Sequence, residues 1–327
     1  MSSAHSESPA DLILAVDAGG TKTAACLARA VGSSDFEVLG RGRAAGANPL
    51  SIGVERAAAN VVAAAAEAAR DAQLVGAPVA RAVLAVAGAA NPAIASEFAR
   101  CTGEADLAQQ ITVVSDVLAV LAAGGDGAGV ALIAGTGSVA YGRDEKGRTI
   151  RCGGWGHLLG DDGGGFAIGR AALRFALTDL ETSRQGYQPF TTMLLDELHA
   201  KSASELMAAI HAGSDPRAVI ASLAHCVGRT AESGDPVAKQ FLDEAARDLA
   251  SLVLRAAQSL GLDLRTAPIS VAGGVLIGSK LLRDGLIEQL SVAGIQAKIR
   301  LISDPLDGCL RLAAANSNAV EPPPVNR

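Results

Sequence analysis

The sequence has few aromatic residues. Only 3% of its 327 residues are Phe, Trp or Tyr, and Trp occurs once. An interior built on large rings is therefore excluded, and Val, Leu, Ile and Ala must fill the space between helices and sheets. Because 49% of the residues are hydrophobic, the chain is long and apolar enough for an α/β fold of two domains.

The chain also lacks a cluster of basic residues. It carries 28 Lys and Arg against 34 Asp and Glu, which gives a formal net charge of -6. Such a balance offers no electrostatic surface for nucleic acid or for an anionic membrane. We therefore expect small-molecule ligands and no nucleic-acid partner.

The cysteines do not indicate a disulfide framework or a zinc site. Their number is odd, they are far apart in the sequence, and none belongs to a C-x-x-C pair. This usage is typical of a reducing compartment. The five residues are Cys26, Cys101, Cys152, Cys226 and Cys309.

No hydrophobic run at the start of the chain is long enough to span a membrane. The first ten residues, MSSAHSESPA, lack a basic region, and the run LILAV that follows Asp11 is too short for a signal-peptide core. We therefore predict a cytoplasmic protein with no membrane partner. Residues 1–10 and 319–327 are predicted to be terminal tails.

The order of predicted elements occurs twice in the chain. Each half begins with a hairpin and a third strand, followed by a helix, a strand, a helix, a strand and a helix. Short stretches also recur: AVDAGGTKT resembles LIAGTGSVA, LAVAGAAN resembles ISVAGGVL, and VVSDVLAVL resembles LISDPLDGC. This pattern predicts a duplicated α/β plan of the type βββαβαβα. Chance similarity is the alternative, since Val-rich strands that end in Gly are common.

The repeat predicts where the domains divide. We expect an N-terminal domain over residues 11–125, joined by the C-terminal helix at 305–318. The C-terminal domain is expected over 126–304. It contains an insertion at about 155–235, after the third strand of the second copy.

The first hairpin, DAGGTKT, offers donors for phosphate oxygens. Gly19 and Gly20 allow a tight turn that exposes backbone N–H groups. Asp17, before the turn, is predicted to hold Mg²⁺ through water. An ordinary tight turn is the alternative interpretation. The side chains predicted to add hydroxyl and ammonium donors are Thr21, Lys22 and Thr23.

A second hairpin, LIAGTGS, offers the same kind of donors. Two facing Gly-Thr hairpins suit a polyphosphate, although neither the Walker A pattern nor the Rossmann G-x-G-x-x-G pattern is present. Gly273 and Gly274 follow a predicted strand and leave room for the adenine and ribose of a nucleotide. The residues of this hairpin are Gly135, Thr136, Gly137 and Ser138.

Asp116 lies between a predicted buried strand and a helix. It could cap that helix, as Asp often does, but the carboxyl ends of strands in open α/β sheets bind ligands. We therefore predict that Asp116 is a general base for an attacking hydroxyl. For Asp304, at the corresponding place in the second repeat, we accept the capping interpretation.

Together, the motifs DAGGTKT, VVSDVLAV, LIAGTGS, CGGWGHLLGDDGG and VAGGV resemble those of the N-acetylglucosamine kinase family in the sugar kinase, chaperone and actin superfamily. The similarity runs from about residue 11 to 318, and GGWGH-x-x-GD is its most specific part. It implies two actin-like, ribonuclease H-like domains that face a nucleotide cleft. It also implies a dimeric enzyme that uses Mg²⁺ and ATP to phosphorylate the 6-hydroxyl of an amino sugar.

The resemblance also implies roles for individual residues. Asp116 corresponds to the catalytic base, while Thr136 and Gly274 correspond to the nucleotide site. One departure is the loop VAGAAN, which has Ala87, Gly88 and Ala89 where a small hydroxyl residue is expected near the sugar. N-acetylglucosamine, glucosamine and N-acetylmuramic acid therefore stay open as substrates. The residues that correspond to the hexosamine site are Asn48, Gly154, Trp155 and Asp161.

The single Trp suits a sugar site chemically. A sugar ring has an apolar face of C–H groups and a rim of hydroxyls, so an indole and a carboxylate complement it. Trp155 is predicted to cover the ring while Asp161 accepts from its hydroxyls; a core Trp followed by a helix cap is the alternative. Asp162 is predicted to cap the next helix and His157 to orient the loop.

Other functions were considered. Activators of 2-hydroxyacyl-CoA dehydratases are ATPases that resemble this family, but their iron–sulfur cluster needs suitably placed Cys thiolates. A non-catalytic sugar-sensing relative would be expected to lose the base or to carry a DNA-binding helix-turn-helix. A zinc-containing hexokinase of the repressor-kinase group is disfavoured because the chain has no C-x-C-G-x-x-G-C cluster.

Overall fold

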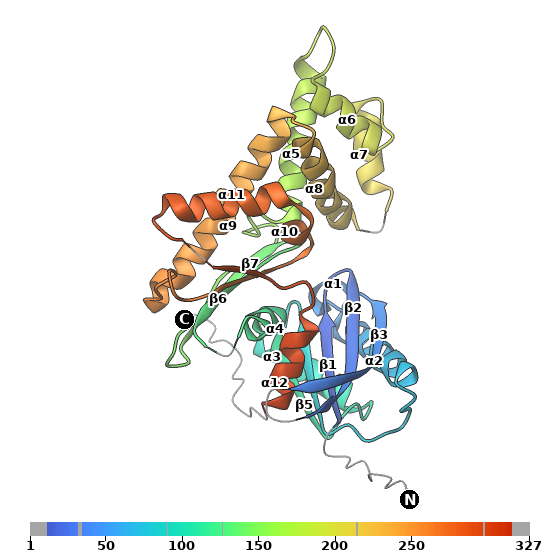
Figure 1. The fold of residues 1–327 in the computed structure, drawn as a ribbon. Coiled ribbons are helices and arrows are strands. Elements are labelled where there is room, and N and C mark those ends of the chain that lie inside the picture. Colours follow the sequence, from blue (N-terminus) through green and yellow to red (C-terminus); the bar gives the residue numbers. More distant parts are fainter. Residues whose placement is uncertain are drawn as a thin grey trace, which may run out of the picture. The chain divides into compact units, whose positions relative to one another are not determined.

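A computed structural model describes residues 12–31, 35–89, 91–125, 127–213, 215–296 and 298–315. These residues form two compact units. The first unit contains the described residues up to 125 together with those from 304 onward, and the second contains those from 127 to 303 (Figure 1). The tails predicted at 1–10 and 319–327 lie outside the described residues.

The first unit is built on a five-stranded mixed sheet. Its order is β3-β2-β1-β4-β5, with β1, β2 and β3 antiparallel and β4 and β5 parallel to β1. The carboxyl ends of β1, β4 and β5 therefore lie at one edge of the sheet. The strands are β1 (Leu12–Ala18), β2 (Lys22–Ala30), β3 (Phe36–Ala45), β4 (Arg81–Val86) and β5 (Gln110–Ser115).

Helices pack on this sheet through alternate residues of its strands. Leu14 and Val16 belong to a core with the alanines of α2, whereas their neighbours Ile13 and Ala15 are buried outside that core. Helix α12, from the end of the chain, packs against β1 and α4 (Figure 1). The helices are α1 (Pro49–Ile52), α2 (Val54–Asp71), α3 (Pro92–Gly103), α4 (Asp116–Ala123) and α12 (Leu306–Ala314).

The second unit repeats the plan of the first. Its sheet has the order β8-β7-β6-β9-β10, with antiparallel β6, β7 and β8 and with β9 and β10 parallel to β6. Strand order and direction match the first sheet, which confirms the duplicated α/β plan. The strands are β6 (Gly129–Ala134), β7 (Ser138–Arg143), β8 (Thr149–Gly153), β9 (Ile269–Ala272) and β10 (Ile299–Leu301).

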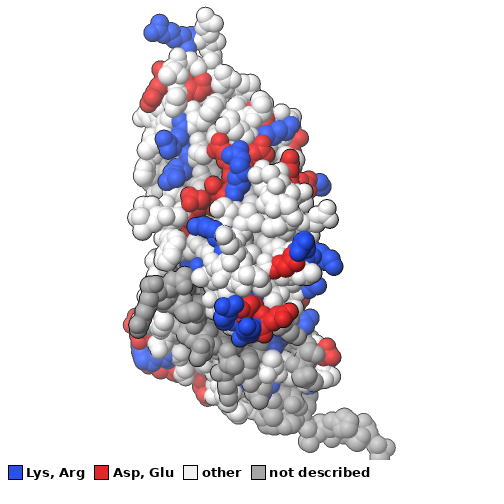
Figure 2. Space-filling model, turned by 90° about the vertical axis from the view of Figure 1, so that its left-hand side faces the viewer, with Lys and Arg blue, Asp and Glu red and all other residues white. Residues whose placement is uncertain are grey.

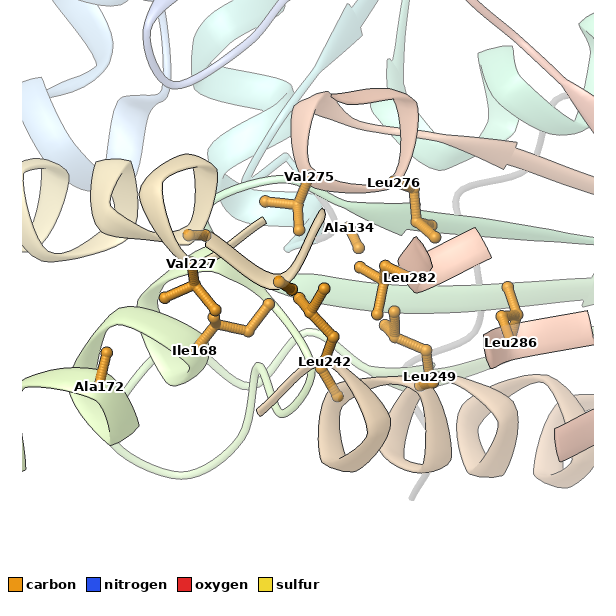
Figure 3. Close-up of a cluster of buried hydrophobic side chains, with 14 of the residues drawn as sticks. Ala134, Ile168, Ala172, Val227, Leu242, Leu249, Val275, Leu276, Leu282 and Leu286 are labelled. Atoms are coloured by element: carbon orange, nitrogen blue, oxygen red, sulfur yellow. The ribbon is translucent and has the colours of Figure 1, made fainter. Parts of the chain in front are cut away.

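Helices dominate the second unit, and leucines from several of them pack against its sheet. Figure 3 shows Leu242 and Leu249 of α9 in one cluster with Leu282 of α11 and Ala134 of β6. The predicted insertion contains four helices, α5 to α8, of which only α5 was predicted. The helices are α5 (Gly165–Thr182), α6 (Pro189–Glu197), α7 (Ala203–His211), α8 (Pro216–Glu232), α9 (Pro236–Leu260), α10 (Gly274–Gly278) and α11 (Lys280–Val292).

The described helices and one face of the surface bear on membrane and anion binding. Within the described ranges, no helix is long and apolar enough to cross a bilayer. On the face drawn in Figure 2, Lys and Arg side chains are interspersed with Asp and Glu. That face therefore shows no broad surface of one charge.

A close helix contact in the first unit gives a test of this packing. A Cβ atom at Gly308 of α12 would lie 1.8 Å from Ala119 O of α4, so Gly308→Ala must push the two helices apart. We expect the free energy of unfolding to fall by about 1–3 kcal/mol, measured by urea denaturation. Gly103→Ala is the control, because nothing lies within 4 Å of a Cβ there; equal losses in both variants would contradict the contact.

Candidate active site

The turn between β1 and β2 forms the first predicted phosphate loop. Gly19 N donates to Lys22 O at 3.0 Å, which closes the turn and confirms the predicted hairpin. Gly20, Thr21 and Lys22 are exposed, and nothing lies within 4 Å of a Cβ at Gly20. The tip of the turn is therefore open to a ligand.

Thr23 does not share this exposure. Its side chain is fully buried, and its hydroxyl donates to Ala45 O of β3 at 2.7 Å. The hydroxyl is thus committed to the sheet, so the predicted phosphate contact of Thr23 is not available in this conformation. The same holds for Ser138 in the second unit, whose buried hydroxyl donates to Asp162 O at 2.6 Å.

Two predicted site carboxylates lie at the same edge of the first sheet, one at the end of β1 and one after β5, with β4 between these strands. The pKa of Asp17, at the end of β1, is raised to about 7: burial is the main cause, the negative charge of Asp116 adds to the shift, and Lys22 opposes it. Like charges raise the pKa of an acid only at short range. Asp17 and Asp116 therefore share one electrostatic environment, and a cation bound there would favour the ionised form of Asp17.

Hydrogen bonds orient Asp116 at the start of α4. Its Oδ1 accepts from Ser115 Oγ at 3.1 Å and from Val117 N at 3.0 Å. The N-cap of α4 is Ser115, so Asp116 is the first helical residue and not the cap. Its carboxylate is partly exposed where β5 ends.

Asp304 is held by structural contacts. Its Oδ1 accepts from Leu306 N at 3.1 Å, and its Oδ2 pairs with Arg41 Nη1 at 2.8 Å. The first contact satisfies a backbone donor at the start of α12, although Pro305 occupies the N-cap position. Asp304 is therefore held by structural contacts, but the predicted N-cap position is wrong, because Pro305 is the N-cap of α12.

Asn48 lies beside the loop that follows β4. It is the N-cap of α1, with Oδ1 accepting from Leu50 N at 2.9 Å. A Cβ at Gly88, where φ is +90°, would lie 2.7 Å from the same Oδ1. Ala89 is 3% exposed and packs in the core, which explains physically why an apolar residue stands where a hydroxyl was expected.

The turn between β6 and β7 forms the second predicted phosphate loop. Gly135 N donates to Gly137 O at 3.0 Å, so this hairpin is also confirmed. The glycine-rich segment 153–165 is hydrogen-bonded to the turn: Gly154 N donates to Ser138 O at 2.9 Å, and Gly165 N donates to Gly135 O at 2.8 Å. The motif that holds the single Trp therefore wraps the predicted phosphate turn.

Two segments, 153–165 and the loop at Gly273, pack closely against this turn. A Cβ at Gly137 would lie 2.3 Å from Asp161 Oδ2, and one at Gly164 would lie 2.6 Å from the carbonyl carbon of Gly137. At Gly273, where φ is +97°, a Cβ would lie 2.3 Å from Ala134 O. Gly274, in contrast, is exposed with open space around it. The structure thus brings the three predicted motifs of the second unit together.

The side chains of the glycine-rich segment have distinct environments. Trp155 is 66% exposed, whereas Asp161 is buried and pairs with Arg217 at 3.6 Å. His157 packs edge-on against Phe166 with ring centroids 5.0 Å apart. The predicted cap role of Asp162 is wrong, because the N-cap of α5 is Gly164, which makes no side-chain cap bond.

Among the residues that the structure describes, no group of three or more His, Cys, Asp or Glu is placed to hold a metal ion.

Comparison with known families identifies the chain. The sequence model of the BadF/BadG/BcrA/BcrD ATPase family matches residues 14–306. The chain belongs to this family.

Named relatives of this ATPase family member confirm the resemblance to N-acetylglucosamine kinases. An N-acetylmuramic acid/N-acetylglucosamine kinase of Clostridium acetobutylicum is 35% identical over 59% of this chain and 63% of its own length. An N-acetyl-D-glucosamine kinase of Dictyostelium discoideum is 30% identical over 62% of this chain and 65% of its own. The matches thus span less than two thirds of these relatives.

Solved structures confirm the fold over nearly the whole chain. A protein of Chromobacterium violaceum, provisionally named an N-acetylglucosamine kinase, has a TM-score of 0.74 at 25% identity and covers 94% of this chain and 100% of its own. A ROK family glucokinase of Streptomyces griseus has a TM-score of 0.56 at 17% identity, covering 92% of this chain and 98% of its own. The ATPase family member therefore has the actin-like fold of sugar kinases.

The environment of Asp17 predicts a pH-dependent stability. Its pKa is about 7 in the folded protein against an ordinary value of 3.8, so between these pH values the folded state keeps a proton that the unfolded state releases. The free energy of unfolding should therefore fall by roughly 2–3 kcal/mol from about pH 5 to pH 8 through this group. Asp17→Asn should remove this component, measured by urea denaturation monitored by circular dichroism.

The control is Asp106→Asn, because Asp106 lies in the same unit and is exposed. The free energy of unfolding of this variant should depend on pH as it does in the unsubstituted protein. If Asp17→Asn shows the same fall in stability between the two pH values, Asp17 is not the group responsible.

Proposed function

We propose that this ATPase family member transfers the γ-phosphoryl group of ATP to the 6-hydroxyl of an amino sugar, such as N-acetylglucosamine or glucosamine. The observation that carries the proposal is the placement of Asp17 and Asp116 at the ends of β1 and β5, on the sheet edge where the open Gly19–Gly20 turn lies. The names of the Clostridium and Dictyostelium relatives support the substrate class.

Both glycine turns are suited to hold the nucleotide. In the first unit, backbone N–H groups at Gly19 and Gly20, with the exposed Thr21 and Lys22, are donors for phosphate oxygens. In the second, Gly135, Thr136 and Gly137 would hold phosphate oxygens, and Gly273 with the exposed Gly274 would leave room for adenine and ribose. Asp17 would hold Mg²⁺ through water, and the ion would neutralise negative charge on the phosphates.

Asp116 would act as the general base. Its carboxylate would accept the proton of the 6-hydroxyl while that oxygen bonds to the γ-phosphorus. The bond between the γ-phosphorus and the bridging oxygen breaks at the same time, so ADP leaves with the bond's electron pair. Because this transfer needs little covalent chemistry from the protein, orientation of the hydroxyl is the main contribution of Asp116.

Four residues are proposed to bind the sugar: Asn48, Gly154, Trp155 and Asp161. An exposed indole suits the apolar face of a sugar, and a buried carboxylate suits its hydroxyls. Closure around the substrates would exclude water that would otherwise hydrolyse ATP.

The family match keeps an ATPase activator as a second candidate, because the family description names ATPases and no sugar. An iron–sulfur cluster needs accessible thiolates. Cys26, Cys226 and Cys309 are buried, while only Cys101 and Cys152 are partly exposed. A visible iron–sulfur absorbance band in anaerobically purified protein would favour the activator over the kinase.

The proposal predicts turnover of Mg-ATP with at least one member of a panel of amino sugars. A coupled assay would test N-acetylglucosamine, glucosamine and N-acetylmuramic acid. Asp116→Asn should lower kcat by about 100-fold or more while sugar binding persists, because a general base contributes on the order of 10²–10⁴ to the rate.

Asp304→Asn is the matched control, since Asp304 is held by Arg41 and Leu306 N, and its kcat should stay within a few-fold of the unsubstituted enzyme. Wild-type turnover in Asp116→Asn would show that another group is the base. No turnover on any amino sugar would contradict the proposed function.

The exposed Trp155 gives a separate prediction for sugar binding. Trp155→Ala should raise the sugar KM by about 10-fold or more, because the lost indole surface covers the substrate, and should leave the KM for ATP unchanged. Tyr187→Ala, at another exposed aromatic residue of the second unit, is the control and should change neither value. A raised ATP KM instead would assign Trp155 to the nucleotide.

A further inference from the structure

Asp161 has a charged neighbour that the sequence motifs do not contain. Arg217 Nη2, from the first turn of α8, lies 3.6 Å from Asp161 Oδ2. Only 7% of the Asp161 side chain and 33% of the Arg217 side chain are exposed. A guanidinium is thus the counter-charge of a nearly buried carboxylate, which would be costly to bury alone.

This ion pair retains capacity for further hydrogen bonds. The separation of 3.6 Å exceeds hydrogen-bond distance, so the carboxylate oxygens are not saturated by the guanidinium. Arg217 Nε is buried and has no hydrogen-bond partner among the described residues. A buried donor without a partner is uncommon in folded proteins and marks a place where a polar ligand can bind.

Both residues occupy positions that are unfavourable for local structure. Asp161 has φ +63°, in the left-handed region that favours glycine, although glycines are common in this segment. Arg217 places a positive charge at the start of α8, where the helix dipole favours a negative one such as the N-cap Asp215. These two costs are consistent with a functional requirement for the pair.

The packing of two helices holds the pair in place. A Cβ at Gly169 of α5 would lie 1.9 Å from Ile220 O of α8, so the backbones are in direct contact. A Cβ at Gly165, the first residue of α5, would likewise lie 3.0 Å from Ala221 O. The start of α8 is therefore fixed against the segment that carries Asp161.

We propose that Arg217 is a positioning residue for the sugar site: it holds the Asp161 carboxylate against the β6–β7 turn so that both oxygens can accept from sugar hydroxyls. The inference rests on the proposed function, because it assigns Asp161 to the sugar. Arg217 acts through Asp161 and does not take part in phosphoryl transfer itself.

Arg217→Gln tests this role. It should raise the sugar KM by about 10-fold or more, because a misplaced ligand group weakens orientation of the substrate, with the KM for ATP unchanged. Arg217→Lys, which keeps the charge, should recover part of the loss. The control is Arg229→Gln on the same helix. Arg229 forms an exposed ion pair with Glu197, away from the glycine-rich segment. The kinetics of this variant should match those of the unsubstituted enzyme.

A double-mutant cycle shows whether Arg217 acts through Asp161. The sugar KM of the Asp161→Asn, Arg217→Gln double variant should be no higher than that of Asp161→Asn alone. If the two substitutions instead multiply in their effects on the sugar KM, Arg217 and Asp161 act independently, and the inference is overturned. A raised ATP KM in Arg217→Gln would assign the guanidinium to phosphate and would also overturn it.

Two further outcomes separate this inference from the proposed function. If the unsubstituted enzyme phosphorylates an amino sugar and Arg217→Gln has the kinetics of Arg229→Gln, only the role of Arg217 fails. If the unsubstituted protein phosphorylates no amino sugar, the proposed function fails and the inference fails with it. A lower melting temperature with unchanged kinetics per folded molecule would assign Arg217 a purely structural role.

Discussion

Direct backbone contact between the segment 153–165 and the β6–β7 turn is the constraint on which the candidate site of the second unit depends. Glycine is required at both sides of this contact, because a Cβ at Gly137 or Gly164 would overlap its neighbour. The main chain therefore forms the turn and its support. Few side chains can fit in such a segment; among them, Trp155 is exposed and Asp161 is buried.

Electrostatics organise the candidate site of the first unit. Parallel strands end at one sheet edge, which places Asp17 of β1 and Asp116 after β5 on the same edge, where the charge of Asp116 raises the pKa of Asp17. Asp304 at this edge is paired with a cation, because its Oδ2 lies 2.8 Å from Arg41 Nη1. Negative charge is therefore concentrated on Asp17 and Asp116. An edge of this kind favours a ligand that arrives with its own cation, such as a metal-bound nucleotide.

Much of this architecture follows from periodicity in the sequence. Alternating apolar residues and the repeated order of elements predicted both sheets, and glycine pairs predicted both hairpins. The hydrogen-bond partners of individual side chains were less predictable. The hydroxyl of Thr23 donates to a backbone carbonyl of β3, and the N-cap of α5 is Gly164 and not Asp162. Arg217 gave no signal because its proximity to Asp161 depends on how α8 packs against α5.

The return of α12 to the first unit has a consequence for synthesis of the chain. This helix packs against β1, and Cys309 Sγ lies 3.6 Å from Val16 O, so residues from the two ends of the sequence complete one core. The second unit lies wholly between them in sequence. During translation the second unit can therefore finish folding before α12 is available to the first unit. The first unit begins to be synthesised first, but its core is completed last.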